Sequence, residues 1–178
     1  TGIIADSLSG VSGAGRNVNA DFLYTECNES ARPYGIPKHR HLSEIEQELS
    51  LAADAQVTIQ FSPHLIPINR GILTTLYLAP TQHFETEAEE TALARQITDC
   101  LATTYGEEPF VRLLPPDILP DTKNVAHTNH LDLAFRLDRR TGRLIMTSAL
   151  DNLVKGASGQ AVQSLNLLFG FDETAGLN

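Results

Sequence analysis

Short runs in which apolar residues alternate with polar ones, or cluster between turn residues, predict β-strands along much of the chain. The runs are GIIADSLSG at 2–10, QVTIQF at 56–61, RGILTTLYLA at 70–79, FVRLL at 110–114 and HLDLAFRLD at 130–138. The RRTG sequence that follows the last run predicts a turn into RLIMTSAL at 143–150, and therefore a hairpin. Residues 17–40 show no sustained period and contain Pro33, Gly35 and Pro37, so they are predicted to form a loop.

Helix-start signals interrupt these strands. Ser43 with Glu46 and Thr86 with Glu89 both match the capping-box spacing, so the first pair predicts a helix from Glu44 and the second a longer one. The buried stripes expected on these helices are Ile45, Leu49 and Ala53 on the first and Leu93, Ile97, Cys100, Leu101 and Thr104 on the second.

A final helix is expected to begin at Asp151, an N-cap residue, and to end near Gly170. Strands joined by hairpins and separated by long helices predict an α+β domain. We expect a mixed, largely antiparallel sheet with helices packed on one face. No internal repeat or linker divides the 178 residues.

Composition and charge narrow the classes of partner. The chain is 42% hydrophobic, enough for one core, and its 13 Lys+Arg against 22 Asp+Glu give a net charge of −9. That balance argues against nucleic acid or an anionic membrane as the main partner, although two arginines can still hold a small anion. No apolar run approaches a membrane span and no signal-peptide pattern opens the chain. Because TGIIADSLSG lacks an initiator methionine, we interpret the chain as a piece of a longer protein.

The two cysteines, Cys27 and Cys100, are too few for a disulfide framework and favour a reducing, cytoplasmic location. Cys100 lies on a helical apolar stripe and is predicted to be a buried core thiol. Cys27 has neither a helix-start context nor a neighbouring histidine, so it is not expected to be a nucleophile.

The turn SGVSGAGRN at 9–17 is the first candidate binding site. Its glycines do not follow the dinucleotide fingerprint, but they allow backbone N–H groups to approach an anion closely. Hydroxyls and a guanidinium fork lie beside them. The residues that would bind the anion are Ser9, Gly10, Ser12, Gly13 and Arg16; the alternative is a flexible surface turn.

HRHLSEI, at 39–45, is more specific. His39 and His41 are two residues apart and would point to the same side of extended backbone. Free N–H groups at the start of a helix disfavour an imidazolium at His41, whereas the carboxylate of Glu44 favours it, so His41 could be neutral near pH 7 and accept a proton. Two alternatives remain open: a metal or anion site formed by His39, His41 and Glu44, and a polar loop packed against a helix.

Two further stretches of the sequence are candidate contact sites. Arg70 follows two prolines in SPHLIPINRGI, a rigid setting for an anion contact, although a solvated surface arginine is the commoner outcome. The small residues at 156–159 are expected where a flat ligand or another domain comes close.

Four stretches, SGVSGAGR, YGIPKHRHLSEI, PHLIPINRGI and DNLVKGASGQAVQSLN, together resemble the N-acetyl-gamma-glutamyl-phosphate reductase family over nearly the whole chain. The resemblance implies the fold of the glyceraldehyde-phosphate and aspartate-semialdehyde dehydrogenases. It also implies NADPH-dependent reduction of an acyl phosphate through a cysteine thioester, in the arginine pathway.

The resemblance also implies roles for individual residues. His41 would be the acid/base, with His39 as the second choice, and Tyr34 and Glu44 would hold the N-acetylglutamyl group. Ser9, Gly10, Ser12, Gly13 and Arg16 would line the substrate and phosphate pocket, with Arg70 as a further anion contact. Asn152 would reach the nicotinamide, and Gly156 and Ala157 would pack near it.

The chain departs from the family's pattern in two places. The Gly-Cys-Tyr-Pro-Thr stretch that carries the family's nucleophile and the dinucleotide-binding domain that binds most of the NADP are both absent from these residues. We therefore expect residues 1–150 to be a substrate-binding and catalytic domain, and residues 151–178 to be a helix that packs on the nucleotide domain. The chain alone would be inactive, and it would self-associate as a dimer or tetramer. The alternative is a non-catalytic metal-binding, anion-binding or dimerisation module.

Overall fold

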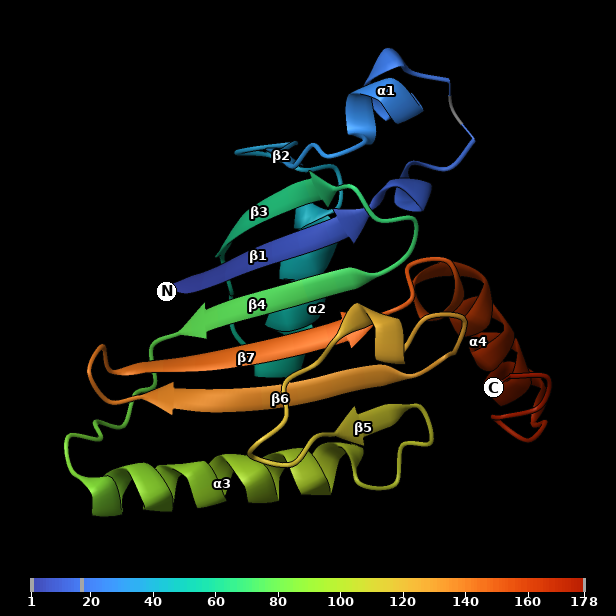
Figure 1. Ribbon diagram of the computed structural model, residues 1–178. Coiled ribbons are helices and arrows are strands. Elements are labelled where there is room, and N and C mark those ends of the chain that lie inside the picture. The colour runs from blue at the N-terminus through green and yellow to red at the C-terminus, as the bar shows by residue number, and fades with distance from the viewer. Residues whose placement is uncertain (1, 17, 178) are drawn as a thin grey trace.

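A computed structural model describes residues 2–16 and 18–177. Within these residues the strands form one seven-stranded sheet in the order β2-β3-β1-β4-β7-β6-β5 (Figure 1). The strands are β1 Ile3–Gly10, β2 Arg32–Pro33, β3 Ile59–Ile66, β4 Ile72–Leu78, β5 Val111–Leu113, β6 Leu131–Asp138 and β7 Arg143–Leu150. Only β1–β3 and β5–β6 pair in parallel among the described strands. The predicted α+β class and the mixed, largely antiparallel sheet are therefore confirmed.

The β6–β7 hairpin forms as predicted, with Asp138 opposite Arg143 beside the turn. Ala134 and Ala149 are buried on one face of it. The connection 114–130 crosses in front of the sheet in Figure 1, and Val125 within this connection has no exposed surface. The small side chains of Ala134 and Ala149 leave room for the connection 114–130 to pack closely on the strands.

Three longer helices lie around the sheet. α2 (Leu42–Ala53) lies behind it as drawn in Figure 1, α3 (Glu87–Tyr105) runs along its β5 edge, and α4 (Gly159–Phe169) lies beside its β7 end. The region predicted as loop contains the short α1 (Tyr24–Cys27) and β2. The capping box of Thr86 and Glu89 is present in both directions, as predicted.

The start of α2 differs from the prediction. The helix begins at Leu42 after His41, and Ser43 provides no cap, because the carboxylate of Glu46 instead accepts the backbone N–H of Ile59 at 3.0 Å. The predicted stripe is also wrong, since no residue of α2 is buried. Ile45 and Leu49 face the sheet across a cavity instead of packing directly on it.

The prediction for Cys100 is wrong as well. Cys100 is exposed and Cys27 is the buried cysteine. Of the stripe predicted on α3, only Leu93 is buried, because the helix lies at the sheet's edge and the described residues cover one narrow side of it.

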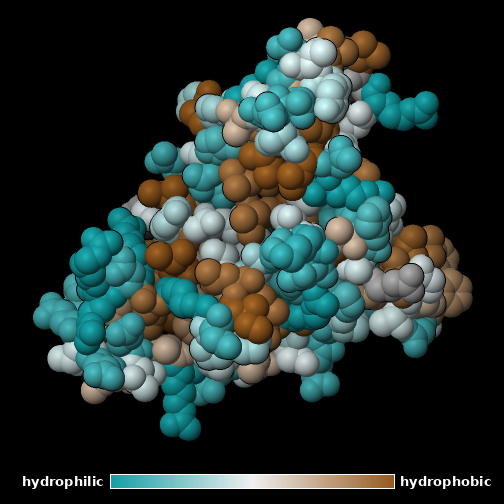
Figure 2. All heavy atoms as spheres, viewed as in Figure 1, coloured by the Kyte–Doolittle hydropathy of each residue, from teal (hydrophilic) through white to brown (hydrophobic). Residues whose placement is uncertain are grey.

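The final helix begins irregularly. Asp151 accepts the N–H groups of Leu153 and Val154, as an N-cap residue does, but the first turn, Val154–Ser158, is a π-helix that precedes α4. Gly170 ends α4 in the left-handed conformation, with φ of 70°, as predicted. Apolar side chains remain exposed along α4, on the right of Figure 2: Val162, Leu165, Leu167, Leu168, Phe169 and, just beyond, Phe171.

Candidate functional site

Two cavities flank the glycine turn at the end of β1. The first, which we call the imidazole cavity, has a volume of about 430 Å³ and lies between α2 and the sheet. Its polar residues include Ser9, Tyr34, His39 and His41, and its walls are mostly aliphatic. The second, the arginine cavity, has a volume of about 460 Å³ and is lined by Ser12, Arg16, Arg70, Phe22, Leu23 and Leu153, among others. The predicted substrate site is therefore divided between two adjacent cavities.

His39 is the centre of a cluster of rings in the imidazole cavity. Its ring contacts those of Tyr34, His41 and Phe61 edge-on, with centroid distances of 5.5, 5.1 and 5.4 Å. Its Nδ1 accepts the backbone N–H of His41 at 3.2 Å. Partial burial, followed by the charges of His41 and Arg40, lowers the pKa of His39, so this imidazole is neutral near pH 7.

Tyr34 lines the same cavity, next to His39. Burial raises the pKa of its phenol, and the Ser9 hydroxyl and Arg40 only partly offset this effect, so the phenol remains a hydrogen-bond donor at neutral pH. The next residue, Gly35, has φ of +63°, and a Cβ there would lie 2.9 Å from Cδ2 of His39. Glycine is therefore required for the loop to fold over the His39 ring.

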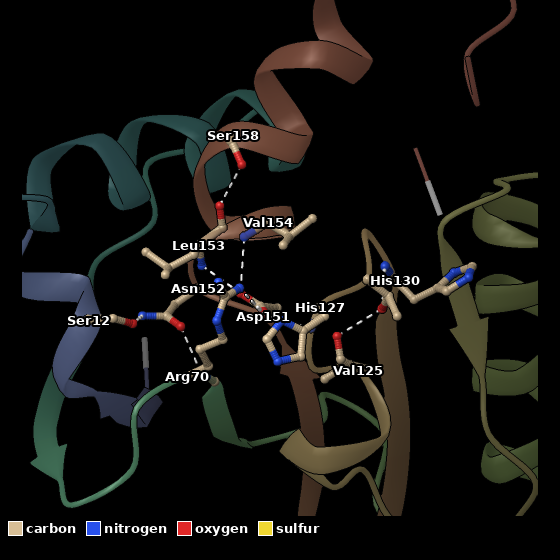
Figure 3. A network of polar contacts seen from close by, with 12 residues as sticks. Ser12, Arg70, Val125, His127, His130, Asp151, Asn152, Leu153, Val154 and Ser158 are labelled. Carbon is tan, nitrogen blue, oxygen red and sulfur yellow. Dashed lines mark hydrogen bonds and ion pairs between the residues drawn. The ribbon is translucent and has the colours of Figure 1, made fainter. Parts of the chain in front are cut away.

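Beside the arginine cavity lies a buried carboxylate, shown in Figure 3. Asp151 has no exposed surface, and Arg70 donates to it from Nη1 at 3.0 Å. The backbone N–H groups of His127, Leu153 and Val154 donate to the same carboxylate at 2.7, 2.8 and 3.1 Å. Burial alone would raise the pKa of Asp151, but these backbone groups and Arg70 outweigh it and lower the pKa.

Asn152 connects the hydrogen-bonded group around Asp151 to the glycine turn. Its Oδ1 accepts the N–H of Gly71 at 2.8 Å, and its Nδ2 donates to Oγ of Ser12 at 2.9 Å (Figure 3). Gly10 packs against the 68–70 loop so closely that a Cβ would lie 3.0 Å from two of its carbonyl oxygens. The turn, the Arg70 loop and the start of the final helix are thus one connected unit.

The structure brings most of the predicted residues to these cavities, but not all of them. Gly13 lies between Ser9 and Asn152, because a Cβ there would be 3.3 Å from both side chains. Glu44 is exposed on α2 and lines neither cavity. Among residues 2–16 and 18–177, no three His, Cys, Asp or Glu side chains converge, so the metal-site alternative has no support there.

The sequence alone did not predict the buried carboxylate of Asp151 or the contact of Phe61 with His39. The sequence predicts Asp151 only as a helix cap and does not show the charged partner beside which it is buried. That partner, Arg70, is 81 residues away, and no local pattern connects the two. Phe61 was assigned to a strand face without any relation to His39.

Comparison with known proteins places the chain in a family. The family model described as "Semialdehyde dehydrogenase, dimerisation domain" matches residues 1–152. The chain therefore belongs to this family. Two curated relatives called N-acetyl-gamma-glutamyl-phosphate reductase are each 51% identical to it. One, from Pelobacter propionicus, matches over 99% of the chain and 49% of its own length; the other, from Akkermansia muciniphila, over 98% and 48%. The chain thus spans about half the length of these relatives.

Solved structures share the fold of this family domain. Aspartate semialdehyde dehydrogenase II from Vibrio cholerae, complexed with ASA, matches 94% of the chain and 54% of its own chain, with a TM-score of 0.67 and 15% identity. A probable aspartate-semialdehyde dehydrogenase from Pseudomonas aeruginosa covers the same shares, with a TM-score of 0.64 and 13% identity. These likenesses show the fold alone. Among the described residues, no helix has the length and apolar character that a membrane span requires.

Proposed function

We propose that the chain is the C-terminal part of an NADPH-dependent reductase that converts N-acetyl-gamma-glutamyl phosphate to N-acetylglutamate semialdehyde and phosphate. The observation that carries this proposal is the identity of about half of all residues to reductases of that name over nearly the whole chain. The imidazole cavity supports it, because a partly apolar cavity with two imidazoles and a phenol at one end suits proton transfer next to an acyl group.

His41 would move the protons. It is exposed at the start of α2 and lines the imidazole cavity, so its ring can take the proton of an incoming thiol and later protonate the oxygen of the nascent aldehyde. Ser9 and Tyr34, beside it, would hold the N-acetylglutamyl group. Glu44 remains a prediction for that binding, although it lines neither cavity.

The nucleophilic thiol would come from outside these residues. Cys27 is buried and donates to the carbonyl of Asp21, Cys100 is on α3, and neither lines either cavity. A thiolate carried by another part of the protein would displace phosphate from the substrate to give a thioester. The chain alone is therefore expected to be inactive.

The displaced phosphate would lie towards the arginine cavity. Arg16 and Arg70 both line this cavity, and Ser12 adds a hydroxyl. Because one nitrogen of Arg70 is already bonded to Asp151, Arg70 is held rigidly and can offer only its remaining donors. Gly10 and Gly13 let the turn pack closely between the two cavities.

NADPH would supply the hydride to the acyl carbon and would be held mainly by the part of the protein outside this chain. Gly156 and Ala157 fit a close approach of the nicotinamide, since both are small and exposed. Asn152 fits less simply, because both ends of its amide are already bonded, to Gly71 and Ser12. Its contact with the cofactor remains a prediction. Residues 151–178 would pack on the nucleotide domain through the apolar side chains exposed along α4.

The protein would act as a homo-oligomer in the cytoplasm, with neither nucleic acid nor membrane as a partner. The family's description as a dimerisation domain supports self-association. The sheet face opposite α2 offers an interface, because Ile4, Tyr77 and Ile145 are paired across β1, β4 and β7 on that face. Figure 2 shows this face, with apolar atoms gathered across its middle.

The test is the reverse reaction of the full-length protein. N-acetylglutamate semialdehyde, phosphate and NADP+ are expected to give NADPH absorbance, whereas aspartate semialdehyde at equal concentration is expected to react at least about 100-fold more slowly, because its shorter, unacylated chain lacks the groups that the site would hold. Equal rates would reject the assigned substrate. The 178-residue chain alone is expected to give no turnover.

A non-catalytic dimerisation module is the second candidate, favoured by the family's description. It predicts that the full-length protein binds neither NADP+ nor NAD+ in calorimetry. Micromolar binding of either cofactor would exclude it.

A further inference from the structure

We propose that His39 is a positioning residue, held as the neutral Nε2–H tautomer by the backbone of His41, and that it orients the His41 ring, which alone exchanges protons. This inference rests on the proposed function, because it assigns different roles to the two imidazoles of the same cavity.

The hydrogen bond between the two histidines fixes the tautomer. Nδ1 of His39 accepts the N–H of His41 at 3.2 Å, and an imidazole nitrogen can accept only when it carries no proton. The ring must therefore be neutral, with its single proton on Nε2. The carbonyl of His39 also accepts the N–H of Leu42 at 3.0 Å. His39 thus caps two N–H groups at the start of α2, where Ser43 provides no cap.

Ring packing holds His39 in place. Phe61, on β3, contacts its ring from the sheet side, and Tyr34 contacts it from the loop. Gly35 has no Cβ and so leaves room for Cδ2 of His39. The His41 ring packs edge-on against this fixed ring at 5.1 Å. A change at His39 therefore displaces His41 through both the backbone bond and the ring contact.

The charges around His39 disfavour its imidazolium form. The titratable or charged groups that face it are His41, Arg40 and Tyr34, all from its own loop. From β3 and α2 the neighbouring cavity residues, Phe61 and Ile45, are uncharged. No carboxylate is among the described residues that line the cavity. Two adjacent imidazolium rings would repel each other without compensation, and this repulsion favours the neutral form of His39 that its hydrogen bond requires.

Two substitutions at His39, each of which keeps one feature of the imidazole, separate positioning from proton transfer. Asn can place its amide oxygen where Nδ1 lies and keep the bond to the His41 N–H, whereas Phe keeps an aromatic ring but has no acceptor. In the full-length enzyme we expect His39→Phe to lower kcat about 10- to 100-fold with KM changed less than about threefold, and His39→Asn to recover most of the loss. The acid limb of the kcat/KM profile should stay in place in His39→Asn. Equal losses in the two variants would contradict the proposal, as would wild-type kcat in His39→Phe.

The tautomer is measured independently of activity. Two-bond ¹H–¹⁵N spectra of the ¹⁵N-histidine-labelled full-length protein, assigned by the signal lost in His39→Asn, should show the Nε2–H form of His39 at pH 7. An Nδ1–H form, or an imidazolium, would overturn the proposal. If the full-length protein lacks reductase activity, the proposed function fails, and these spectra still decide the state of His39.

Discussion

The carboxylate of Asp151 lies 3.0 Å from the guanidinium of Arg70, although 81 residues separate them in the sequence. The pair joins the loop between β3 and β4 to the start of the final helix. Because Asp151 is completely buried, its charge needs this partner and the three backbone N–H groups around it. The arginine cavity thus has one wall fixed by an ion pair between the buried Asp151 carboxylate and the partly exposed Arg70.

Removing this charge is expected to destabilise the fold. Asp151→Asn keeps the shape of the side chain but loses the charge, and we expect a loss of about 3 kcal/mol in the free energy of unfolding, measured by urea denaturation. In the double variant Asp151→Asn, Arg70→Met, the cost should be at least about 1 kcal/mol less than the sum of the two single costs. Additive costs would mean that the pair does not interact.

The same carboxylate predicts a pH dependence. The pKa of Asp151 is lowered in the folded state, so its contribution to stability is complete above the ordinary Asp pKa of about 4 and is lost as the pH falls through the lowered value. Between pH 6 and pH 2.5, the wild type should therefore lose more unfolding free energy than Asp151→Asn, in which this group cannot titrate. Parallel stability curves would remove Asp151 from this role.

The two glycines of the small-residue run should respond in opposite ways to alanine. A Cβ at Gly159 would lie 2.3 Å from Oδ1 of the buried Asn129 and 2.9 Å from the carbonyl oxygen of Val154. Gly159→Ala should therefore lower the free energy of unfolding by at least about 1–3 kcal/mol. At Gly156 the nearest atom would be Cδ1 of Leu150 at 3.4 Å, an ordinary contact. Gly156→Ala is the matched control and should leave the free energy of unfolding unchanged or raise it slightly, when both variants are measured by urea denaturation. A reversed order would contradict the packing described.

Self-association should depend on the sheet face opposite α2. Tyr77 is 37% exposed on that face, and Tyr77→Glu should weaken dimerisation at least about tenfold in sedimentation equilibrium, because a charge would be buried in the interface. Leu51, 69% exposed on α2, supplies the control Leu51→Glu, which should leave the association constant unchanged. A wild-type monomer well above micromolar concentration would contradict the interface altogether.

Most of the fold could be predicted because its signals are local. The alternation at 130–138 and the capping box of Thr86 predict a hairpin and a helix that the structure confirms. The start of α2 could not be predicted in the same way, because Glu46 bonds to Ile59, a contact across 13 residues that overrides the local capping pattern. Cys100 was misplaced since helical period alone does not say which helix lies at the edge of a sheet.

The candidate site was predictable in its residue types but not in its arrangement. Ser9, Tyr34, His39 and His41 line one cavity, although the sequence analysis grouped Ser9 with Arg16 and Arg70. The arginines line a different cavity, because Asp151 draws Arg70 towards the final helix. The distinction between the two histidines also depends on the 3.2 Å hydrogen bond from the His41 N–H to Nδ1 of His39, which no sequence pattern shows.

The most direct test of the central claim, that the His41 ring moves protons for the reductase, is steady-state kinetics of His41→Ala in the full-length protein. His83, exposed and outside both cavities, provides the control His83→Ala. We predict that His41→Ala lowers kcat about 100- to 10,000-fold and changes the substrate Kd less than about threefold, while His83→Ala behaves as wild type. A kcat for His41→Ala equal to that of the control would contradict the account.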